Sequence, residues 1–210
     1  MPDAGERPAF TSSQRLGFIR ANTALLPVPH VPEISLHVAH EAMEPPPFWA
    51  FAWAGGQALA RYLLDHPAVV AGKHVLDFAS GSGLVAIAAM KAGARVVEAA
   101  EIDAYAIEAI GLNARANTVS IAASLGDILG EDRGWDVILA GDVCYEQGMA
   151  ARVIGWLEGL QARGATVLIG DPGRSYLPKA KLTELATYMV PVVGALEDNE
   201  VKKTSVWGIA

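Results

Sequence analysis

Cysteine is nearly absent from this sequence, which has only Cys144 among its 210 residues. One thiol forms no internal disulfide and supplies too few ligands for a cysteine-based zinc site, so disulfide-rich and zinc-finger folds are excluded. A reducing, cytoplasmic compartment is therefore expected. No His lies near Cys144 in the sequence to activate it, so we expect this residue to pack in the core.

Long apolar runs are also missing. No stretch reaches the roughly 18 to 20 uncharged residues that a membrane-spanning helix needs, because Gly, Asp or Arg interrupts the strongest runs. The first twenty residues mix Asp3 and Glu6 with Arg7, Arg15 and Arg20, and they lack the apolar segment of an export signal. The sequence predicts a soluble protein that is neither exported nor bound to a membrane.

An excess of positive charge is lacking as well. The chain carries 16 Lys and Arg against 23 Asp and Glu, a formal net charge of -7, and the basic residues are scattered singly or in pairs. Because a phosphate backbone attracts clustered basic side chains, a nucleic-acid partner is not expected. An acidic surface suits a basic peptide segment better, although acidity also serves solubility.

Hydrophobic residues make up 52% of the chain, which suffices for one well-buried domain, and 210 residues are too few for two of ordinary size. Residues 1–52 predict a short helix at Ser12–Ala24 and then an extended arm, because proline interrupts the arm at positions 27, 29, 32 and 45–47. A helix over Trp53–Asp65 then opens a domain that spans residues 53–210.

From His74 onward, short β-rich runs alternate with helical ones, which is typical of a parallel sheet covered on both faces. Strands are predicted at His74–Ala79, Arg95–Glu101, Ser120–Leu125, Trp135–Gly141 and Ala165–Gly170. Helices are predicted at Gly83–Ala92, Ala104–Asn117, Met149–Ala162 and Lys179–Leu185. Thr187–Val193 and Val201–Ile209, separated by the polar stretch Glu197–Glu200, predict a terminal hairpin. The expected fold is α/β, a doubly wound, mostly parallel seven-stranded Rossmann-like sheet that ends antiparallel.

A glycine loop follows the first predicted strand, in the segment Asp77-Phe78-Ala79-Ser80-Gly81-Ser82-Gly83. Gly81 and Gly83 allow a sharp turn and a close approach of a ligand, while the start of the next helix offers unpaired N–H donors. Asp77, on the strand just ahead of the glycines, is placed to bind the amino group of a ligand. The segment predicts a nucleotide-like ligand, although two glycines in such a turn can also be structural.

Two acids follow at the ends of the next two predicted strands. Glu101 lies 24 residues after Asp77, where nucleotide-binding sheets place an acid on the ribose hydroxyls. Asp103 is an alternative ribose ligand, but its place before a helix fits an N-cap better. Asp127 follows Gly126 and lies near the adenine amino group or serves as a turn residue.

A nicotinamide dehydrogenase is the main alternative, because Gly81-Ser82-Gly83-Leu84-Val85-Ala86 also fits the dinucleotide-binding pattern with Ala in its last place. Two features favour a methyltransferase. Asp77 precedes the glycines, and no second domain is left to hold the substrate of a hydride transfer. A non-enzymatic binding module on the same fold is a further alternative.

Together, the glycine loop, Glu101, Asp127 and the terminal hairpin resemble the class-I S-adenosylmethionine-dependent methyltransferases over roughly residues 48–210. Ala79 stands where many members have the first glycine, which is a mild departure. The resemblance implies S-adenosylmethionine as the cofactor. It implies a binding set of Trp53, Gln57, Asp77, Ala79, Ser80, Gly81, Gly83, Glu101, Ile102 and Asp127.

Three further segments narrow this resemblance. The tryptophan-rich stretch over residues 47–61 is similar to the lysine methyltransferases that modify the electron transfer flavoprotein β subunit. Asp142-Val143-Cys144-Tyr145 matches the Asp-x-x-Tyr/Phe motif of the wider protein-lysine group, and residues 171–178 also resemble these enzymes. The resemblance implies a protein partner with an acceptor lysine, namely that flavoprotein subunit and, in bacterial relatives, also the ribosomal stalk protein. Related enzymes modify ribosomal protein L11 or small amines such as nicotinamide, so these acceptors stay open.

Asp142 and Tyr145 are the expected catalytic residues on the acceptor side. Lysine has a pKa near ~10.4 and must lose a proton before it attacks a methyl group. Asp142 is expected to orient the ammonium and help the proton leave, and Tyr145 to wall the lysine channel, unless they are a turn cap and a core residue. Trp49, Phe51 and Trp53 are also readable as core aromatics. No metal is expected, since the reaction needs none and His37 and His40 lack a clear third ligand.

Overall fold

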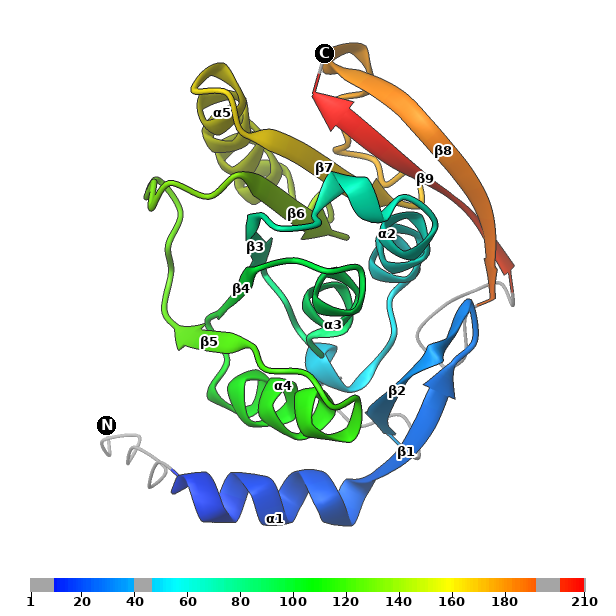
Figure 1. The fold of residues 1–210 in the computed structure, drawn as a ribbon, viewed down its shortest axis with the longest axis vertical. Helices are drawn as coiled ribbons and strands as arrows, with labels where there is room; N and C mark the ends of the chain where they lie inside the picture. The colour runs from blue at the N-terminus through cyan, green and yellow to red at the C-terminus, as the bar shows by residue number, and fades with distance from the viewer. Residues whose placement is uncertain (1–9, 40–46, 192–200, 210) are drawn as a thin grey trace, which may run out of the picture.

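A seven-stranded sheet forms the centre of the computed structural model, which describes residues 10–39, 47–191 and 201–209 (Figure 1). The strand order is β5-β4-β3-β6-β7-β9-β8. Neighbours from β5 to β7 are parallel, while β9 is antiparallel to both β7 and β8. The strands are β3 His74–Phe78, β4 Val96–Glu101, β5 Ala122–Leu125, β6 Val137–Gly141, β7 Thr166–Asp171, β8 Leu182–Pro191 and β9 Val201–Ile209. This order confirms the predicted fold.

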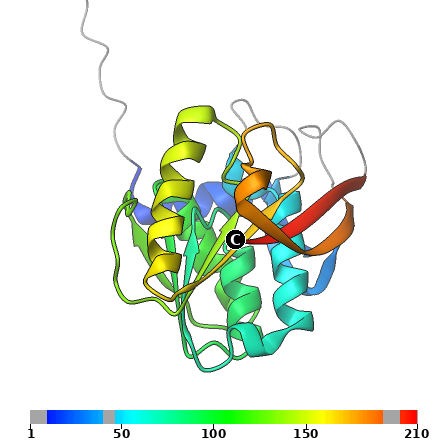
Figure 2. The same cartoon turned by 90° about the horizontal axis from the view of Figure 1, so that it is seen from above.

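Helices cover both faces of the sheet, because side chains along each strand alternate between two cores. On one face, Val137 and Leu139 of β6 belong to the same core as buried residues of α2, α3 and α4. On the other face, Ile138 and Ala140 pack with buried residues of α5. Figure 1 shows α2, α3 and α4 in a row, and Figure 2 shows α5 apart from α2 and α3. The helices are α2 Ala54–Asp65, α3 Leu84–Lys91, α4 Ala104–Ala116 and α5 Gln147–Ala162.

The N-terminal segment is not the extended arm that the prolines predicted. After α1 (Ser12–Asn22), the chain forms an antiparallel hairpin of β1 (Thr23–Val28) and β2 (Val31–Ala39). Within the described ranges, these two strands pair with each other and with no further strand, so each has one edge without a strand partner there, and such edges tolerate proline. The prediction of an extended arm was therefore wrong for residues 23–39, which form a hairpin. Residues 45 and 46 of the proline run and His40 lie outside the described residues.

The hairpin is docked on the main core. Asn113 of α4 accepts a hydrogen bond from the His37 N–H at 2.8 Å. Asn117 holds Ser35 on both sides, accepting from its N–H at 3.1 Å and donating to its carbonyl at 2.7 Å. The apolar side chains of β2 that join this core are fully buried: Val31, Ile34 and Leu36. The hairpin therefore shares its core with the sheet that carries the glycine loop.

The largest error of the sequence analysis is the helix predicted at Lys179–Leu185. The structure has one short 3-10 turn, η3 (Lys179–Lys181), and then β8, whose ten residues include most of the predicted strand Thr187–Val193. Pairing with β9 along the whole of β8 outweighs the helical preference of the local residues. The polar stretch predicted at Glu197–Glu200 lies outside the described residues. The other predicted helices and strands of the sheet differ from the structure by one or two residues at their ends.

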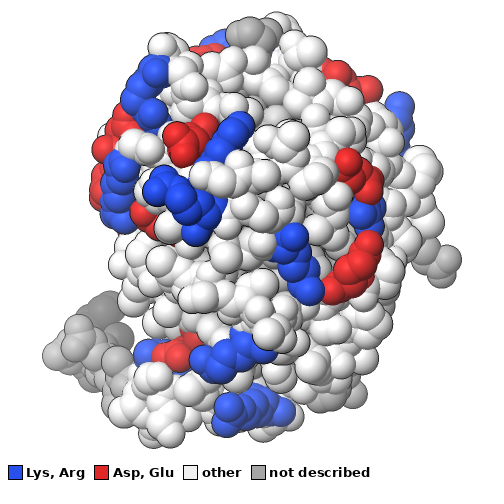
Figure 3. Space-filling model, viewed as in Figure 1, with Lys and Arg blue, Asp and Glu red and all other residues white. Residues whose placement is uncertain are grey.

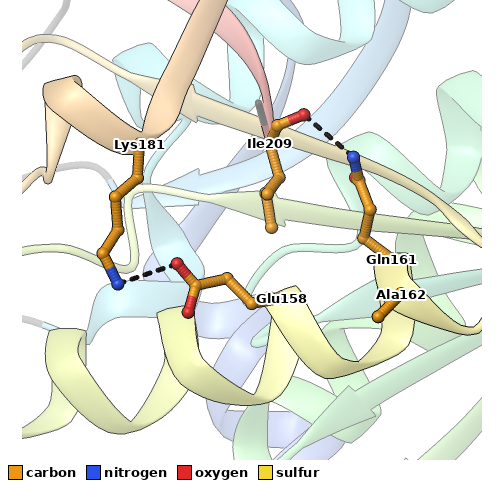
Figure 4. A pocket seen from close by; sticks show the side chains of 5 residues that line it. All are labelled: Glu158, Gln161, Ala162, Lys181 and Ile209. Atoms are coloured by element: carbon orange, nitrogen blue, oxygen red, sulfur yellow. Dashed lines mark hydrogen bonds and ion pairs between the residues drawn. The ribbon is translucent and has the colours of Figure 1, made fainter.

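A cavity of about 360 Å³ lies between the last turns of α5, the end of η3 and the end of β9 (Figure 4). Lys181 Nζ contacts Glu158 Oε1 at 2.8 Å across it, and Gln161 Nε2 donates to the Ile209 carbonyl at 2.9 Å. Gly208, beside Ile209, pairs with Leu168 in the first half of β7. The cavity therefore lies away from the carboxyl ends of the parallel strands, where ligands of such sheets bind.

Two surface properties bear on the expected partners. Among the described residues, no helix is long and apolar enough to cross a membrane. On the face seen in Figure 3, Lys and Arg side chains lie among Asp and Glu side chains. The described part of the chain contains several ion pairs, such as Arg61 with Asp65 at 2.7 Å and Arg163 with Asp132 at 2.6 Å.

Candidate functional site

The carboxyl ends of β3 and β6 meet the start of α2 at a narrow cleft of about 50 Å³. Its lining comes from three parts of the sequence: the aromatic segment before α2, the glycine loop after β3 and the end of β6. The lining residues are Phe51, Trp53, Gly56, Asp77, Ala79, Ser80, Gly81, Ser82, Leu84, Val85, Gly141 and Asp142. The structure thus brings half of the predicted cofactor set into one cleft with Asp142, namely Trp53, Asp77, Ala79, Ser80 and Gly81. The other half lies outside this lining: Gln57, Gly83, Glu101, Ile102 and Asp127.

Asp77 is the buried anchor of the glycine loop and is 1% exposed. Its Oδ2 accepts hydrogen bonds from the Ser80 hydroxyl at 2.5 Å and from the Ala86 N–H of α3 at 3.0 Å. Burial raises the pKa of Asp77 to about 7, against the lowering effect of these two bonds. A cation in the cleft would favour its charged form, so Asp77 is suited to meet a ligand's ammonium group.

The loop after Asp77 turns through three residues with positive φ. Ala79 has φ 53°, Gly81 has φ 54° and Gly83 has φ 82°. Gly83 is the N-cap of α3 and has no side chain to cap it, and the first two helix residues, Leu84 and Val85, line the cleft. The left-handed conformation of Ala79 carries the kind of strain that functional turns often hold.

Glu101 links the glycine loop to the end of β4. Its Oε2 accepts from the Gly81 N–H at 2.9 Å, and its Oε1 accepts from the Ile102 N–H at 2.7 Å and the Asp103 N–H at 3.3 Å. Asp103 accepts from the Tyr105 N–H at 2.8 Å as the N-cap of α4, which confirms the helix-cap interpretation. Ile102 is 74% exposed beside Glu101, so it offers an apolar surface at the same strand end.

Asp127 is exposed, and its Oδ1 accepts from the Leu129 N–H at 2.9 Å, the bond of a turn residue. Its predicted adenine contact stays a prediction.

Gln57 is fully buried and lies outside the cleft lining. Its amide accepts from the His30 N–H at 3.1 Å and donates to the Ala52 and Pro191 carbonyls at 2.7 and 3.2 Å. Gln57 thus ties the N-terminal hairpin and β8 to α2, and its predicted cofactor contact stays a prediction.

Asp142 follows β6 with a left-handed backbone, φ 58°. Its N–H donates to the Gly170 carbonyl at 2.8 Å, and its Oδ2 accepts from the Gly56 N–H at 2.9 Å. The carboxylate therefore caps the first turn of α2, whose own N-cap residue, Trp53, makes no side-chain cap. Burial raises the pKa of Asp142 to about 6, with Arg174 acting in the opposite direction. Asp142 does not cap the following helix α5, because Glu146 does.

Arg174 was not predicted as a site residue, although the segment that contains it had been noted. Its Nη2 donates to Asp142 Oδ1 at 2.9 Å, and its guanidinium carbon lies 6.0 Å from the centroid of the Trp53 ring. The backbone N–H groups of Gly173 and Arg174 both donate to Asp171 Oδ1 at 2.7 Å. Asp171 is buried at the end of β7, and burial raises its pKa. The sequence signals for Arg174 were an acid-proline-glycine-arginine turn after a strand, which many proteins contain, and the resemblance of residues 171–178 to the protein-lysine methyltransferases.

Two aromatic residues, Phe51 and Trp53, line the cleft, and further aromatic rings lie next to Trp53. Tyr145 is 54% exposed, so it is not a core residue, and its ring stacks 6.3 Å from the ring of Phe48. Trp53 Nε1 donates to the Phe48 carbonyl at 2.7 Å. Trp49 is instead buried, 6.4 Å from Tyr105 and nearly parallel to it, in the cluster that joins α1 and α4. The tryptophan-rich segment thus has both a core part and a cleft part.

Other reactive side chains have structural surroundings. Cys144 is buried as predicted, and burial raises the pKa of its thiol to about 12. His37 has its pKa lowered by burial, and its Nδ1 lies 3.0 Å from the Thr23 hydroxyl. In the part of the chain that the structure describes, no group of three or more His, Cys, Asp or Glu residues is placed to hold a metal ion.

Comparison with known proteins agrees with this geometry. The Mus musculus electron transfer flavoprotein β subunit lysine methyltransferase is 42% identical over 168 residues, which are 77% of this chain and 66% of the mouse protein. The Xenopus laevis protein of the same name is 38% identical, covering 77% of this chain and 68% of the relative. The chain belongs to this lysine methyltransferase family. A Caenorhabditis elegans homologue in the family is 32% identical and covered over 73% of its length.

The family extends beyond the part that this chain matches, since the chain spans 66% of the length of the mouse protein, just under two thirds. A broader sequence family, described as ribosomal protein L11 methyltransferase, matches residues 57–142. Among solved structures, a Synechocystis magnesium protoporphyrin IX methyltransferase with bound SAM has a TM-score of 0.55 at 14% identity, covering 74% of this chain and 78% of that one. The Lactobacillus delbrueckii ribosomal protein L11 methylase has a TM-score of 0.51 at 21% identity, with the same two coverages. These structures establish the fold of the family member described here.

Proposed function

We propose that this protein is a methyltransferase that moves a methyl group from S-adenosylmethionine to a lysine of the electron transfer flavoprotein β subunit. One observation carries the proposal: the buried Asp142 carboxylate lies in the same cleft as the glycine loop, with Trp53 beside it. A ligand site and a cation-binding carboxylate thus adjoin. The names of the family relatives supply the acceptor. A cytoplasmic location is part of the proposal, because the single buried thiol suits a reducing compartment.

The residues of the cleft fit S-adenosylmethionine. A Cβ added at Gly81 would meet nothing nearer than Trp49 Cα at 4.0 Å, so the loop is open above its backbone. Asp77 and the start of α3 suit the amino acid part of the cofactor, and Glu101 with the exposed Ile102 suits the ribose and the adenine. When bound, the cofactor supplies an electrophilic methyl group. Glu101 retains acceptor capacity for hydroxyls, since a carboxylate has about four lone-pair sites.

The acceptor side needs a group that binds an ammonium and allows it to lose a proton. Asp142 is held on two sides, by the Gly56 N–H and by Arg174, so its carboxylate is fixed in direction. Trp53 lines the cleft, and the exposed ring of Tyr145 stacks on Phe48, whose ring centroid lies 5.8 Å from that of Trp53. Fixing the amine in line with the methyl group is worth several kcal/mol in reactions of this kind, so orientation by Asp142, Trp53 and Tyr145 is the main catalytic contribution that we assign.

The test uses purified protein, labelled S-adenosylmethionine and purified electron transfer flavoprotein β subunit. We expect label on a lysine of the subunit, and thermal stabilisation of the enzyme by S-adenosylhomocysteine but not by NAD, because a ligand of the folded state raises apparent stability. Stabilisation by NAD alone would revive the dehydrogenase interpretation. Binding of S-adenosylhomocysteine without labelling of any protein in a cell lysate would refute lysine transfer.

Ribosomal protein L11 is the second candidate acceptor, because a family of that description matches residues 57–142. The L11 methyltransferase of Laribacter hongkongensis is 43% identical, but only over 34% of this chain. The family match ends at Asp142 and does not include Arg174. We therefore rank L11 below the flavoprotein subunit. The same labelling experiment with L11 as substrate decides between the two acceptors.

A further inference from the structure

The positive charge beside Asp142 comes from Arg174 of the same chain, and the role inferred for it rests on the proposed function. Arg174 Nη2 contacts Asp142 Oδ1 at 2.9 Å while its guanidinium carbon lies 6.0 Å from the Trp53 ring centroid. A carboxylate and the face of an aromatic ring are the two features that hold an alkylammonium ion. They converge on one position, and Arg174 occupies it.

The surroundings of Asp142 show what this arginine does there. Asp142 is only 11% exposed at its side chain, which favours the neutral acid. Asp171, at the end of β7, also favours the neutral acid, and Cys144 from the same motif is a neutral thiol with its pKa raised to about 12. From α2 comes the Gly56 N–H, and from the loop after β7 comes Arg174, both of which favour the carboxylate. Arg174 supplies the positive charge in this set.

The arginine side chain is held more weakly than the backbone that carries it. Asp171 fixes the loop by accepting from the N–H groups of Gly173 and Arg174, each at 2.7 Å. The Arg174 side chain is 24% exposed, and its buried Nε has no hydrogen-bond partner. The side chain is held by one ion pair, one ring contact and the charge of Asp171, whereas the loop backbone is fixed separately, so the side chain can leave while the loop stays in place. An incoming ammonium would then replace it, so the buried carboxylate would not be left without a cation, which is the costly arrangement.

We propose that Arg174 is the resident cation of the acceptor-lysine position: it keeps Asp142 ionised and aimed before the acceptor binds, and the acceptor lysine displaces it. Arg174 is thus a positioning residue, acting through Asp142. Two opposing effects of its removal follow. Asp142 becomes harder to ionise, and the acceptor no longer has to compete for the position.

Arg174→Gln removes the charge and keeps hydrogen-bond donors. The pKa of Asp142, followed by carbon-13 NMR of its carboxyl group in the free protein, should rise by about one unit or more, the usual effect of losing an adjacent opposite charge. The acidic limb of kcat/KM for methylation of the flavoprotein subunit should shift upward with it. At about pH 9, where Asp142 is ionised in both proteins, KM for the acceptor should fall at least about threefold, which is within the range of measured ion pairs. Arg174→Lys should restore most of both effects.

The matched control is Arg163→Gln, the same substitution at the Arg163–Asp132 ion pair, which should move neither the Asp142 titration nor KM. S-adenosylhomocysteine affinity checks that each variant is intact, and Arg174→Met serves the same test if Arg174→Gln does not fold. An unchanged Asp142 titration overturns the proposal, and so does a KM at about pH 9 that equals or exceeds that of the wild type. If the wild type methylates no protein, the proposed function fails, whereas the NMR titration still decides whether Arg174 governs Asp142.

Discussion

Replacing Gly55 with alanine should destabilise the folded protein, whereas replacing Gly56 with alanine should change its stability little. A Cβ on Gly55 would lie 2.2 Å from the Gly170 carbonyl oxygen and 2.6 Å from Asp142 Oδ2, and neither the strand backbone nor the paired carboxylate can move away easily. A Cβ on Gly56 would meet nothing nearer than Val85 Cγ2 at 3.8 Å. The two glycines are neighbours in the first turn of α2. The effect of alanine on backbone entropy should therefore be nearly the same at both positions.

The magnitude follows from two opposing contributions. Forcing a methyl group into a packed core costs about 1 to 3 kcal/mol, and contact with backbone belongs at the upper end of that range. Replacing glycine with alanine in a helix returns about 0.5 to 1 kcal/mol. With a cost at the upper end of the first range, we expect Gly55→Ala to lower the free energy of unfolding by about 2 kcal/mol net. Gly56→Ala should stay within about 1 kcal/mol of the wild type, in either direction.

Urea unfolding of the free proteins, followed by tryptophan fluorescence, measures both variants. With an m-value of about 2 kcal/mol/M, the expected loss for Gly55→Ala moves the midpoint down by about 1 M. The same variant should also weaken the contact of the Gly56 N–H with Asp142 and thereby reduce methylation. Equal midpoints for Gly55→Ala and Gly56→Ala would refute the argument that the helix start is packed directly against β7.

Three further predictions concern the carboxylates. Glu101→Ala should weaken binding of S-adenosylhomocysteine at least about tenfold in calorimetry, because bonds to a charged group are worth about 1.5 to 3 kcal/mol, and unchanged affinity would move the ribose contact elsewhere. Asp142→Asn should keep that affinity within about threefold while methylation of the protein acceptor falls by at least about 100-fold, so near-normal methylation would limit Asp142 to capping α2. The pKa of Asp77, about 7 in the folded protein, lies above its ordinary value, so its contribution to stability is present at low pH and lost as the pH rises toward 7. Relative to Asp77→Asn, the free protein should lose up to about 4 kcal/mol between about pH 4 and pH 8 in denaturation experiments, and a constant difference would argue against a buried acid there.

The sequence by itself determined the sheet and the cofactor side of the cleft. Strand β3, the glycine loop and the acid at the end of β4 are local patterns: a buried apolar run, residues that tolerate positive φ, and a polar residue where a strand stops. Their meeting follows from one rule, that the carboxyl ends of parallel strands share an edge. For the same reason Asp142, at the end of β6, lies in the same cleft as the glycine loop.

Only the tertiary structure shows which contacts surround Asp142. Arg174 reaches Asp142 across 32 positions of sequence, and Gly55 approaches Gly170 because a helix start is packed against a strand end. Neither contact leaves a periodic signal, since each depends on how two separate segments are packed. Residues 179–185 make the same point for secondary structure: their local preference is helical, but pairing with β9 makes most of them a strand. Local propensities differ by about 1 kcal/mol, so long-range pairing prevails wherever the two disagree.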